Sequence, residues 1–398
     1  MRIITRTVWI LSLVSLFADV ASEMLYPVIP VYLRHIGFSV LLIGVLEGVV
    51  NFTAGISKGY FGAWSDQKGL RLPFVKWGYF LGALSKPMMA FFTWPWWVFL
   101  VRSTDRLGKG VRTAARDALL SQQCEPQNRG RVFGFHRGMD TIGASLGPML
   151  ALVFLFCYPG SYTTLFYLAF VPGLLSVAMT FLMKETRQPV AEPKKNQFFS
   201  YFGYWKIASP AFRNAMPGFV LFALFNSADI FLLLITRNTL DGRNLQIGSL
   251  LLNADSLTIG AYIFYNWVYA LFSYPLGSLA DKWGTRPVII GGLFLYSLVY
   301  AGFSRQPGLP VIIALFFCYG IYAAATEGVI KAWISQQADV KHRATAIGFY
   351  TSLESIGALA ASILAGVLWT GWGASATFAV PAIAALLAAG WLLRYLNS

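Results

Sequence analysis

Long apolar runs alternate with short polar connections along the whole chain. A helix needs about 20 mostly apolar residues to cross the hydrocarbon core of a bilayer, and it satisfies its own backbone polar groups where no water can. The runs lack the alternation of apolar and polar positions that membrane β-barrel strands show. The sequence therefore predicts an all-α membrane protein with twelve transmembrane helices near residues 8–33, 39–64, 75–93, 95–118, 131–157, 162–183, 211–236, 258–280, 287–304, 309–334, 344–369 and 374–394.

Composition agrees with this pattern. Of the 398 residues, 57% are hydrophobic and 12% are charged, whereas soluble domains carry about 25% charged residues. The three cysteines show neither metal-ligand spacing nor an even disulfide framework, so we expect no bound metal and no cofactor. The first apolar run is too long for a signal-peptide core and is interpreted as the first span.

The net charge is +14, and the basic residues are distributed as the predicted topology requires. Of the 31 lysines and arginines, 21 fall in the two termini and the even-numbered connections, and only four fall in the odd-numbered connections. By the positive-inside rule, both termini are predicted to be cytoplasmic in a bacterial inner membrane. Because this placement accounts for the basic charge, we do not expect a nucleic-acid partner.

An internal repeat divides the chain. Two predicted loops, one in each half, share the pattern G-x-x-x-D-x-x-G-x-R. The first loop supplies Gly62, Asp66, Gly69 and Arg71, and the second supplies Gly277, Asp281, Gly284 and Arg286. A further match at nearly the same offset relates 121–144 to 335–358 and aligns Asp140 with Glu354.

The repeat predicts two six-helix bundles at residues 1–184 and 211–398, joined by a polar cytoplasmic linker at 185–210. Because the offset spans an even number of helices, the two bundles have the same orientation in the membrane. Such parallel repeats are related by an axis along the membrane normal.

With twelve helices, two halves, a central linker and the duplicated loop signature, the chain resembles the major facilitator superfamily (MFS) over essentially its whole length. The resemblance implies that the loops gate the cytoplasmic side. In the family, the loop aspartate looks like the partner of a basic residue and of a neighbouring helix end in the outward-open state. That role transfers to Asp66 with Arg71, and to Asp281 with Arg286. A tight turn with incidental charges is the alternative interpretation.

Two further motifs refine the resemblance. Residues 105–118 contain D-R-x-G-K-G-x-R followed by R-D-A, which resembles a bacterial branch of the superfamily, as do segments 22–27 and 134–140. The antiporter pattern G-x-x-x-G-P is met by Gly143, Gly147 and Pro148, but Met149-Leu150 replaces the usual glycine pair. This departure argues against drug–proton antiport, and close helix packing also explains the glycines.

Carboxylates within the spans are candidate proton-coupling groups. A charge at the bilayer centre costs on the order of 3 kcal/mol, so a retained charge needs a partner or water. Asp19 and Glu23 lie four residues apart on one helix face, and Asp229 is the repeat counterpart of Asp19. Asp140 and Glu354 complete the predicted proton-coupling set. A static ion pair between Asp19 and a basic residue of 95–118 is the alternative.

Charged residues also follow one face of the predicted helix 95–118. Arg102, Asp105 and Arg106 are candidate substrate contacts, and they could instead neutralise the acids of neighbouring helices. Farther along, the residues nearest the predicted cytoplasmic surface are assigned to the gate; they are Arg112, Arg116 and Asp117.

The remaining candidates lie on other helices. Arg137 precedes Asp140 by three residues, so a local ion pair or a substrate contact is expected of it. Lys331 is the expected partner of Glu354 and also of Glu327. Tyr26 and Asn226 are candidate cavity-lining residues, although aromatic side chains are also common at the membrane interface.

These features favour secondary active transport of a small organic solute by alternating access, coupled to protons. No phosphate-binding loop G-x-x-x-x-G-K-[ST] is present, and no histidine pair or nucleophile set suggests an enzyme. Efflux, and uptake of an anionic or metal-chelate (siderophore-like) solute, both remain open. A non-transporting sensor would require a signalling domain larger than 185–210. We expect a monomer.

Overall fold

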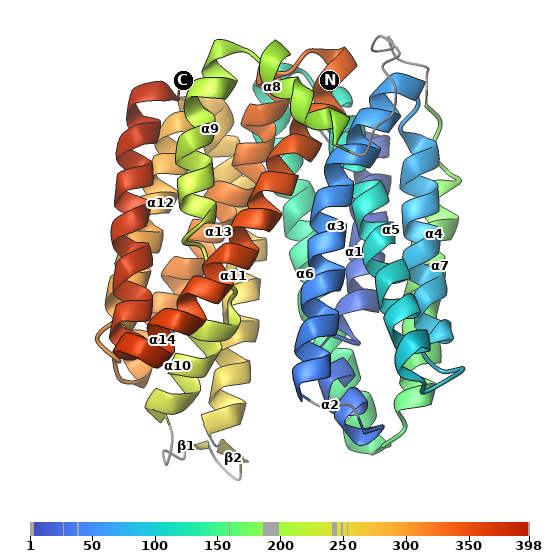
Figure 1. Cartoon of the computed structure of the whole chain (residues 1–398), viewed down its shortest axis with the longest axis vertical. Helices are drawn as coiled ribbons and strands as arrows, with labels where there is room; N and C mark the ends of the chain where they lie inside the picture. The colour runs from blue at the N-terminus through green and yellow to red at the C-terminus, as the bar shows by residue number, and fades with distance from the viewer. Residues whose placement is uncertain are drawn as a thin grey trace.

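Helices make up nearly all of the computed structural model, which describes residues 4–26, 28–37, 40–158, 160–185, 199–240, 245–247, 250–252 and 254–396. Figure 1 shows two helical bundles side by side, with both termini at the same end. The first bundle contains α1 (Arg6–Glu23), α2 (Val28–His35), α3 (Val40–Lys68), α4 (Leu72–Met88), α5 (Pro95–Gln122), α6 (Arg129–Cys157) and α7 (Tyr162–Thr180). The second contains α9 (Pro210–Ala223), α10 (Ile230–Leu240), α11 (Ala254–Trp283), α12 (Thr285–Phe303), α13 (Leu309–Gln337) and α14 (Arg343–Tyr395).

These helices form twelve spans, as predicted. Within the described residues, α1 with α2 and α9 with α10 each make one interrupted span, and α14 contains two spans that meet at Gly373. Gly373 has a φ of 82°, a left-handed conformation that glycine adopts without steric cost. Five described helices are by themselves long and apolar enough to cross a membrane. Charged residues interrupt others, notably α5.

The connections contain short elements that the hydropathy pattern did not predict. Strands β1 (Leu245–Ile247) and β2 (Leu250–Leu252) pair antiparallel between α10 and α11. Short helices η1 (Pro126–Asn128) and η3 (Val340–His342) precede α6 and α14 at equivalent places in the two bundles.

The expected linker, 185–210, is partly helical where the structure describes it. It contains η2 (Ser200–Gly203) and α8 (Tyr204–Ile207). Tyr201 and Tyr204 are buried, and Trp205 stacks on Phe349 of α14 with ring centroids 6.2 Å apart. Tyr201 also lies against Gly59 of α3, so this part of the linker packs against both bundles and is less polar than predicted. Residues 186–198 lie outside the described part.

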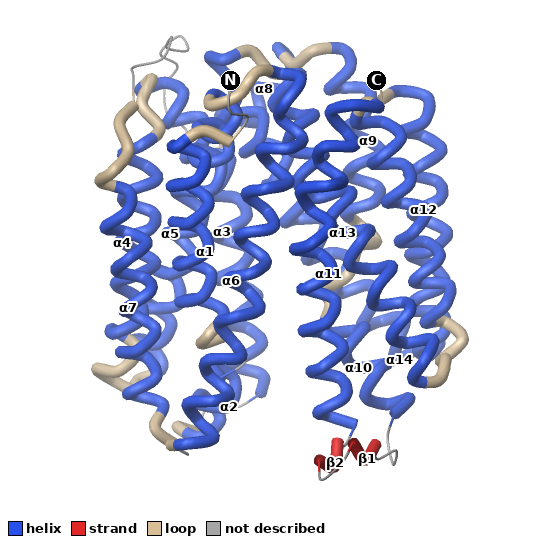
Figure 2. The backbone as a smooth tube through the Cα atoms, turned by 180° about the vertical axis from the view of Figure 1, so that it is seen from behind, coloured by secondary structure: helices blue, strands red, loops and turns tan. Residues whose placement is uncertain are grey.

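The two bundles contact each other through α3 on α14 and α6 on α11. Figure 2 shows these helices converging at the end that carries the termini and diverging toward the opposite end. Small residues allow the close approach. A Cβ atom added to Gly277 would overlap the carbonyl oxygen of Gly130, and one added to Gly62 would lie 2.5 Å from that of Ala344. Any larger side chain at these positions would force the helices apart.

Candidate transport site and gates

The first loop signature forms a latch between the bundles. The Asp66 carboxylate accepts hydrogen bonds from Arg71 (2.8 Å) and from the backbone N–H and hydroxyl of Thr345 (2.7 and 2.8 Å). Thr345 lies in the first turn of α14, where unpaired N–H groups and the helix dipole favour an anion. Arg71 also donates to the carbonyl oxygen of Val340 (3.0 Å). Asp66 and Arg71 are both buried, so the contact is shielded from solvent.

The second loop signature makes the equivalent contact. Asp281 accepts hydrogen bonds from the backbone N–H groups of Gly130 (2.7 Å) and Arg131 (2.8 Å), in the first turn of α6. Arg131 and Thr345 occupy equivalent positions in the internal repeat, which aligns 121–144 with 335–358. We call the Asp66–Thr345 and Asp281–Arg131 contacts the terminal-end latches.

The expected partnership of Asp281 with Arg286 is wrong. Arg286 instead donates to the carbonyl oxygen of Leu393 near the end of α14. The basic group nearest Asp281 is Arg131, at 4.0 Å. Gly284, between the two residues, has a φ of 91° and turns the chain directly into α12. Arg286 follows in that helix and reaches α14 within its own bundle.

Two ion pairs join the bundles deeper in the fold. Lys331 of α13 pairs with Asp117 of α5 at 2.8 Å. Arg137 of α6 pairs with Glu327 of α13 and donates to the hydroxyl of Tyr269 of α11 (2.7 Å). Each pair takes one residue from each bundle. We call these two contacts the inner ion pairs.

The inner ion pairs correct two expectations. Lys331 pairs with neither Glu354 nor Glu327, because its side chain reaches across to Asp117. Glu354 instead accepts from the hydroxyl of Tyr350 one turn earlier (3.2 Å). The preference for partners in the same half was wrong because α13 packs against α6 and α5 of the other bundle.

Asp140 lies at the centre of a charged network in the first bundle. The expected ion pair with Arg137 is present at 3.3 Å, and Arg116 lies at 3.8 Å. Arg116 also pairs with its neighbour Asp117 at 2.8 Å and donates to Ser15 of α1 at 2.8 Å. Because Asp117 also belongs to an inner ion pair, Asp140 is connected through Arg116 to the boundary between the bundles.

Asp19 and Glu23 lie next to this network. The charges acting on Asp19 are those of Asp140, Lys109, Arg112 and Glu23. No ion pair of Asp19 is found among the described residues. Lys109 is exposed in the middle of α5, and a charged side chain at that depth must face water rather than lipid. Lys109 therefore faces water, whereas Arg112 and Asp140 are buried and Glu23 is half-buried.

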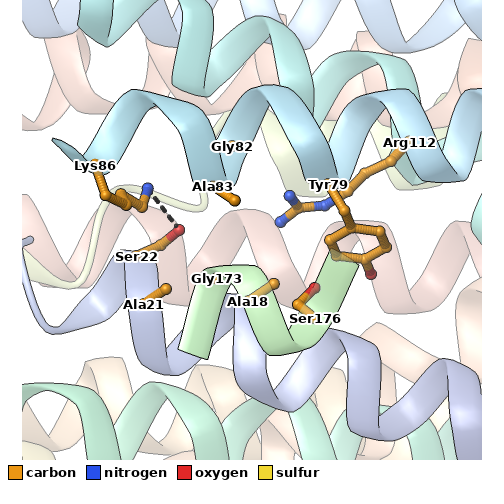
Figure 3. A pocket seen from close by; sticks show the side chains of 10 residues that line it. All are labelled: Ala18, Ala21, Ser22, Tyr79, Gly82, Ala83, Lys86, Arg112, Gly173 and Ser176. Carbon is orange, nitrogen blue, oxygen red and sulfur yellow. Dashed lines mark hydrogen bonds between the residues drawn. The ribbon is translucent and has the colours of Figure 1, made fainter. Parts of the chain in front are cut away.

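The substrate-contact candidates of α5 lie partly inside the first bundle. Asp105 pairs with Lys86 of α4 at 2.5 Å and accepts from Ser85 at 3.2 Å. Arg102 and Asp105 line a small cavity with Lys86. Figure 3 shows the adjoining cavity of about 10 Å³, where Lys86 donates to Ser22 of α1. That space suits about one water molecule. Arg106 is half-buried.

Four further predicted residues belong to different environments. Arg112 lines the cavity of Figure 3 and stacks over the ring of Tyr79 at 4.2 Å, so it packs within the first bundle. Tyr26 is 54% exposed. In the second bundle, Asp229 accepts from Tyr319 at 2.7 Å, and Asn226 lies in the interruption between α9 and α10.

Sequence reasoning missed several contacts that matter here. Glu185 accepts from the backbone N–H groups of Arg71 (2.9 Å) and Leu72 (2.7 Å), and so caps α4 beside the first latch. The pair of Lys86 with Asp105 was also missed, because Asp105 was assigned to substrate. Nothing in the sequence indicated Thr345 or Tyr269, because hydroxyl side chains are common in membrane helices.

Cys124 lies beside the second latch, in the connection after α5. The charges acting on it are those of Arg129, Asp281 and Arg343, and burial raises the pKa of its thiol to about 11. Because the thiolate is the reactive form, Cys124 reacts slowly in this conformation. Of the other two cysteines, Cys157 is exposed and Cys318 is half-buried.

Comparisons with known proteins agree with the fold. The family described as the Major Facilitator Superfamily matches residues 11–260 and 250–397. A Methanocaldococcus jannaschii protein, the uncharacterized MFS-type transporter MJ1317, is 31% identical over 372 residues, covering 92% of this chain and 89% of its own. The Bacillus subtilis MFS-type transporter YuxJ is 21% identical and covers 97% of both chains.

Solved structures show the same fold. The Escherichia coli fucose:proton symporter FucP superposes with a TM-score of 0.80 at 11% identity and covers 100% of both chains. The human organic anion transporter MFSD10 superposes with a TM-score of 0.75 at 16% identity, covering 97% of this chain and 99% of its own. Taken with the family match and the archaeal relative, these findings show that the chain is a multi-pass membrane transporter and belongs to the Major Facilitator Superfamily.

Proposed function

We propose that this protein is a proton-coupled secondary active transporter that moves a small, negatively charged organic solute across the bacterial inner membrane by alternating access. The observation that carries the proposal is the pair of terminal-end latches. Two equivalent carboxylates, Asp66 and Asp281, each bind the first turn of a helix in the opposite bundle, at the same end of the molecule. Contacts of this kind can break and re-form as one bundle rocks against the other.

The charge distribution supports a cytoplasmic location for the latches. The predicted topology places both termini, and the ends of α3 and α11 that contain Asp66 and Asp281, on the positively charged side of the membrane. With the latches closed at that end, we infer that water reaches the exposed Lys109 from the opposite side of the membrane. This structure then corresponds to an outward-facing state, and return to the inward-facing state requires both latches and both inner ion pairs to open.

Proton coupling is proposed for the acids next to Arg116. Asp19, Glu23 and Asp140 act on one another electrostatically, so binding of a proton at Asp19 changes the charge that Asp140 and Arg116 experience. Arg116 shares Asp117 with Lys331 of the second bundle. Protonation in the first bundle can thereby weaken a contact between bundles. This coupling needs no large movement at the acid itself.

The negative charge of the solute is inferred from α5. Lys109 is exposed, and the charges that act on it are those of Asp19, Arg106, Glu23 and Arg112. An exposed cation beside a second one, Arg106, favours an anionic ligand. Arg102, Arg106 and Arg137 are the proposed substrate contacts. Uptake and efflux both fit this arrangement.

The proposal is tested by measuring flux in proteoliposomes. A panel of anionic, neutral and cationic solutes is offered with and without an imposed pH gradient. We expect an anionic solute to accumulate at least about tenfold above empty liposomes when the gradient is present, and accumulation to collapse when a protonophore is added. Transport only of cationic solutes, or transport indifferent to the pH gradient, would contradict the proposal.

Reversing one inner ion pair provides a second prediction. Asp117→Lys or Lys331→Asp alone leaves like charges facing each other in a buried contact, and breaking a buried pair costs about 3–5 kcal/mol. We expect each single variant to reduce initial transport rates by about a hundredfold. The double variant Asp117→Lys with Lys331→Asp restores the attraction between the bundles but loses the pair of Asp117 with Arg116, so the recovery should be partial, to at least a tenth of the wild-type rate.

The matched control for this swap is Arg305, an exposed residue after α12. Among the described residues its side chain forms only a weak hydrogen bond, to the carbonyl oxygen of Ala301. Arg305→Asp should leave transport unchanged. If the double variant were no more active than the single variants, while all purified as folded monodisperse protein, the contact between Asp117 and Lys331 would not be a functional one.

A further inference from the structure

The interruption between α9 and α10 concentrates oxygen atoms that lack partners. The helix stops at Ala223 and resumes at Ile230. Within this break, the side-chain oxygens of Asn226 and Ser227 are buried and form no hydrogen bond among the described residues. The hydroxyl of Tyr300, from α12, is likewise buried without a well-formed bond. Buried polar groups in proteins are nearly always paired, so three such atoms together require an explanation.

The Tyr300 hydroxyl lies near the Asp229 carboxylate, and Asn226 and Ser227 precede Asp229 by three and two residues in the same break. The charge of Asp229 acts on the Tyr300 hydroxyl, which also lies close to Ser227 and Tyr319. Tyr319 donates to Asp229 at 2.7 Å. Among the described residues, no lysine or arginine forms an ion pair with Asp229, and no basic side chain contributes to its electrostatic environment. A half-buried carboxylate therefore lies without a cation beside three unpaired oxygens.

The surroundings fit a small cation and leave no space for a large one. Tyrosine rings pack directly on each other around Asp229. The centroids of Tyr296 and Tyr300 lie 4.0 Å apart, and those of Tyr265 and Tyr319 lie 4.9 Å apart. An organic ammonium group would have to separate these rings. A bare metal ion needs only the oxygens that are already present.

The ligand chemistry selects a hard monovalent ion. Carboxylate, amide, hydroxyl and backbone carbonyl oxygens suit hard cations. A Ca²⁺ site normally uses several carboxylates among six to eight oxygens, whereas Asp229 offers one negative charge. Unwound segments of interrupted helices bind Na⁺ in other transporters through carbonyl oxygens that the helix no longer uses. The carbonyl end of α9 points into this break and adds a favourable dipole.

We propose that Asn226, Ser227, Asp229 and Tyr300 form a Na⁺ site at the break between α9 and α10. The site is close to the first bundle, since Tyr262 of α11 senses Asp229 together with Glu23 and Tyr26 of the first span. A bound Na⁺ would neutralise Asp229 and hold α10 against α12. Na⁺ would then be a second coupling ion in addition to protons. That coupling role rests on the proposed transport function, but ion binding itself does not.

The test is direct binding of ²²Na⁺ to the purified full-length protein, without any substrate, by scintillation proximity. Wild-type protein should bind about one Na⁺ per chain, displaced by Li⁺ but not by choline. Ser227→Ala and Tyr300→Phe should each weaken binding about tenfold, and Asp229→Asn should abolish it. The matched control is Thr236→Ala on α10, a buried hydroxyl that already donates to Leu232 at 2.7 Å. It should bind as wild type does.

Several outcomes would overturn the site. They are the absence of saturable Na⁺ binding to wild-type protein, displacement of Na⁺ by choline, and wild-type affinity in folded Ser227→Ala protein. Should Asp229→Asn fail to fold, Ser227→Ala and Tyr300→Phe decide the matter alone. Loss of the Na⁺ site would leave the proton-driven flux experiment unaffected, so the two proposals fail separately.

Discussion

Replacing Gly277 by valine should prevent the terminal end from closing and abolish transport. The reason is steric, because even a single Cβ at this position would overlap the carbonyl oxygen of Gly130. Helix backbones cannot yield locally as a flexible side chain can, so α11 and α6 must separate. Overpacking costs about 1–3 kcal/mol, and about 3 kcal/mol shifts a two-state equilibrium by more than a hundredfold. Gly277→Ala should show a smaller effect in the same direction.

The labelling rate of Cys124 provides a direct measurement of the separation of α11 from α6. Opening the second latch hydrates its thiol, returns the pKa from about 11 toward the ordinary value of 9.0, and raises the thiolate fraction at pH 7.5 by roughly a hundredfold. In a Cys157→Ser, Cys318→Ser background, maleimide should therefore label Cys124 much faster in Gly277→Val protein than in the parent. The labelling rate of the parent should rise steadily from pH 7 to pH 10.

The control is Gly291 of α12, where an added Cβ meets nothing within 4 Å. Gly291→Ala should label Cys124 at the parent rate and transport normally. Unchanged labelling and transport in Gly277→Val protein would mean that the close approach of α6 and α11 is not part of the transport cycle.

Removing the charge of Asp19 should uncouple transport from protons. Asp19→Asn cannot bind and release a proton, yet it keeps nearly the same shape. It also removes the negative charge that acts on Lys109 and Arg112, which leaves those cations less compensated. We expect gradient-driven accumulation to fall about a hundredfold, while exchange of labelled for unlabelled solute across the membrane persists. The same measurements on Glu23→Gln establish whether both acids are required.

A matched control tests whether replacing any carboxylate within a span by an amide uncouples transport from protons. Asp105→Asn also replaces a buried carboxylate, but Asp105 already pairs with Lys86 at 2.5 Å. That variant should lose stability because it leaves Lys86 unpaired, and the surviving folded protein should remain proton-coupled. If Asp19→Asn and Glu23→Gln both kept full accumulation driven by the pH gradient, the proposed coupling group would be wrong.

Much of the fold could be predicted because the bilayer imposes a one-dimensional constraint on the chain. Each span must supply about 20 mostly apolar residues, so hydropathy alone placed twelve spans close to the observed helices. The offset of the internal repeat then anticipated which residues are equivalent. Asp66 and Asp281 contact Thr345 and Arg131, which are themselves equivalent positions of the repeat. The two helix interruptions were not predicted, because hydropathy averaged over a whole span of about 20 residues does not resolve a break of only a few residues.

The choice of charged partners was decided by the tertiary structure. Spacing along one helix correctly predicted Arg137 with Asp140, because residues three apart share a helix face. The same reasoning failed for Lys331 and Arg286, whose partners come from another helix. Packing between α5, α6 and α13 brought Lys331 to Asp117 and Glu327 to Arg137.

What the sequence determined by itself is the number of spans, their grouping into two related bundles, and the loops that form the latches. Each of these follows from local composition or from repetition within the chain. Only the tertiary structure decided which ionised side chains face each other and which buried oxygens lack partners. The physical reason is that charge pairing and ligand geometry depend on distances of a few ångströms between helices that lie far apart in the sequence.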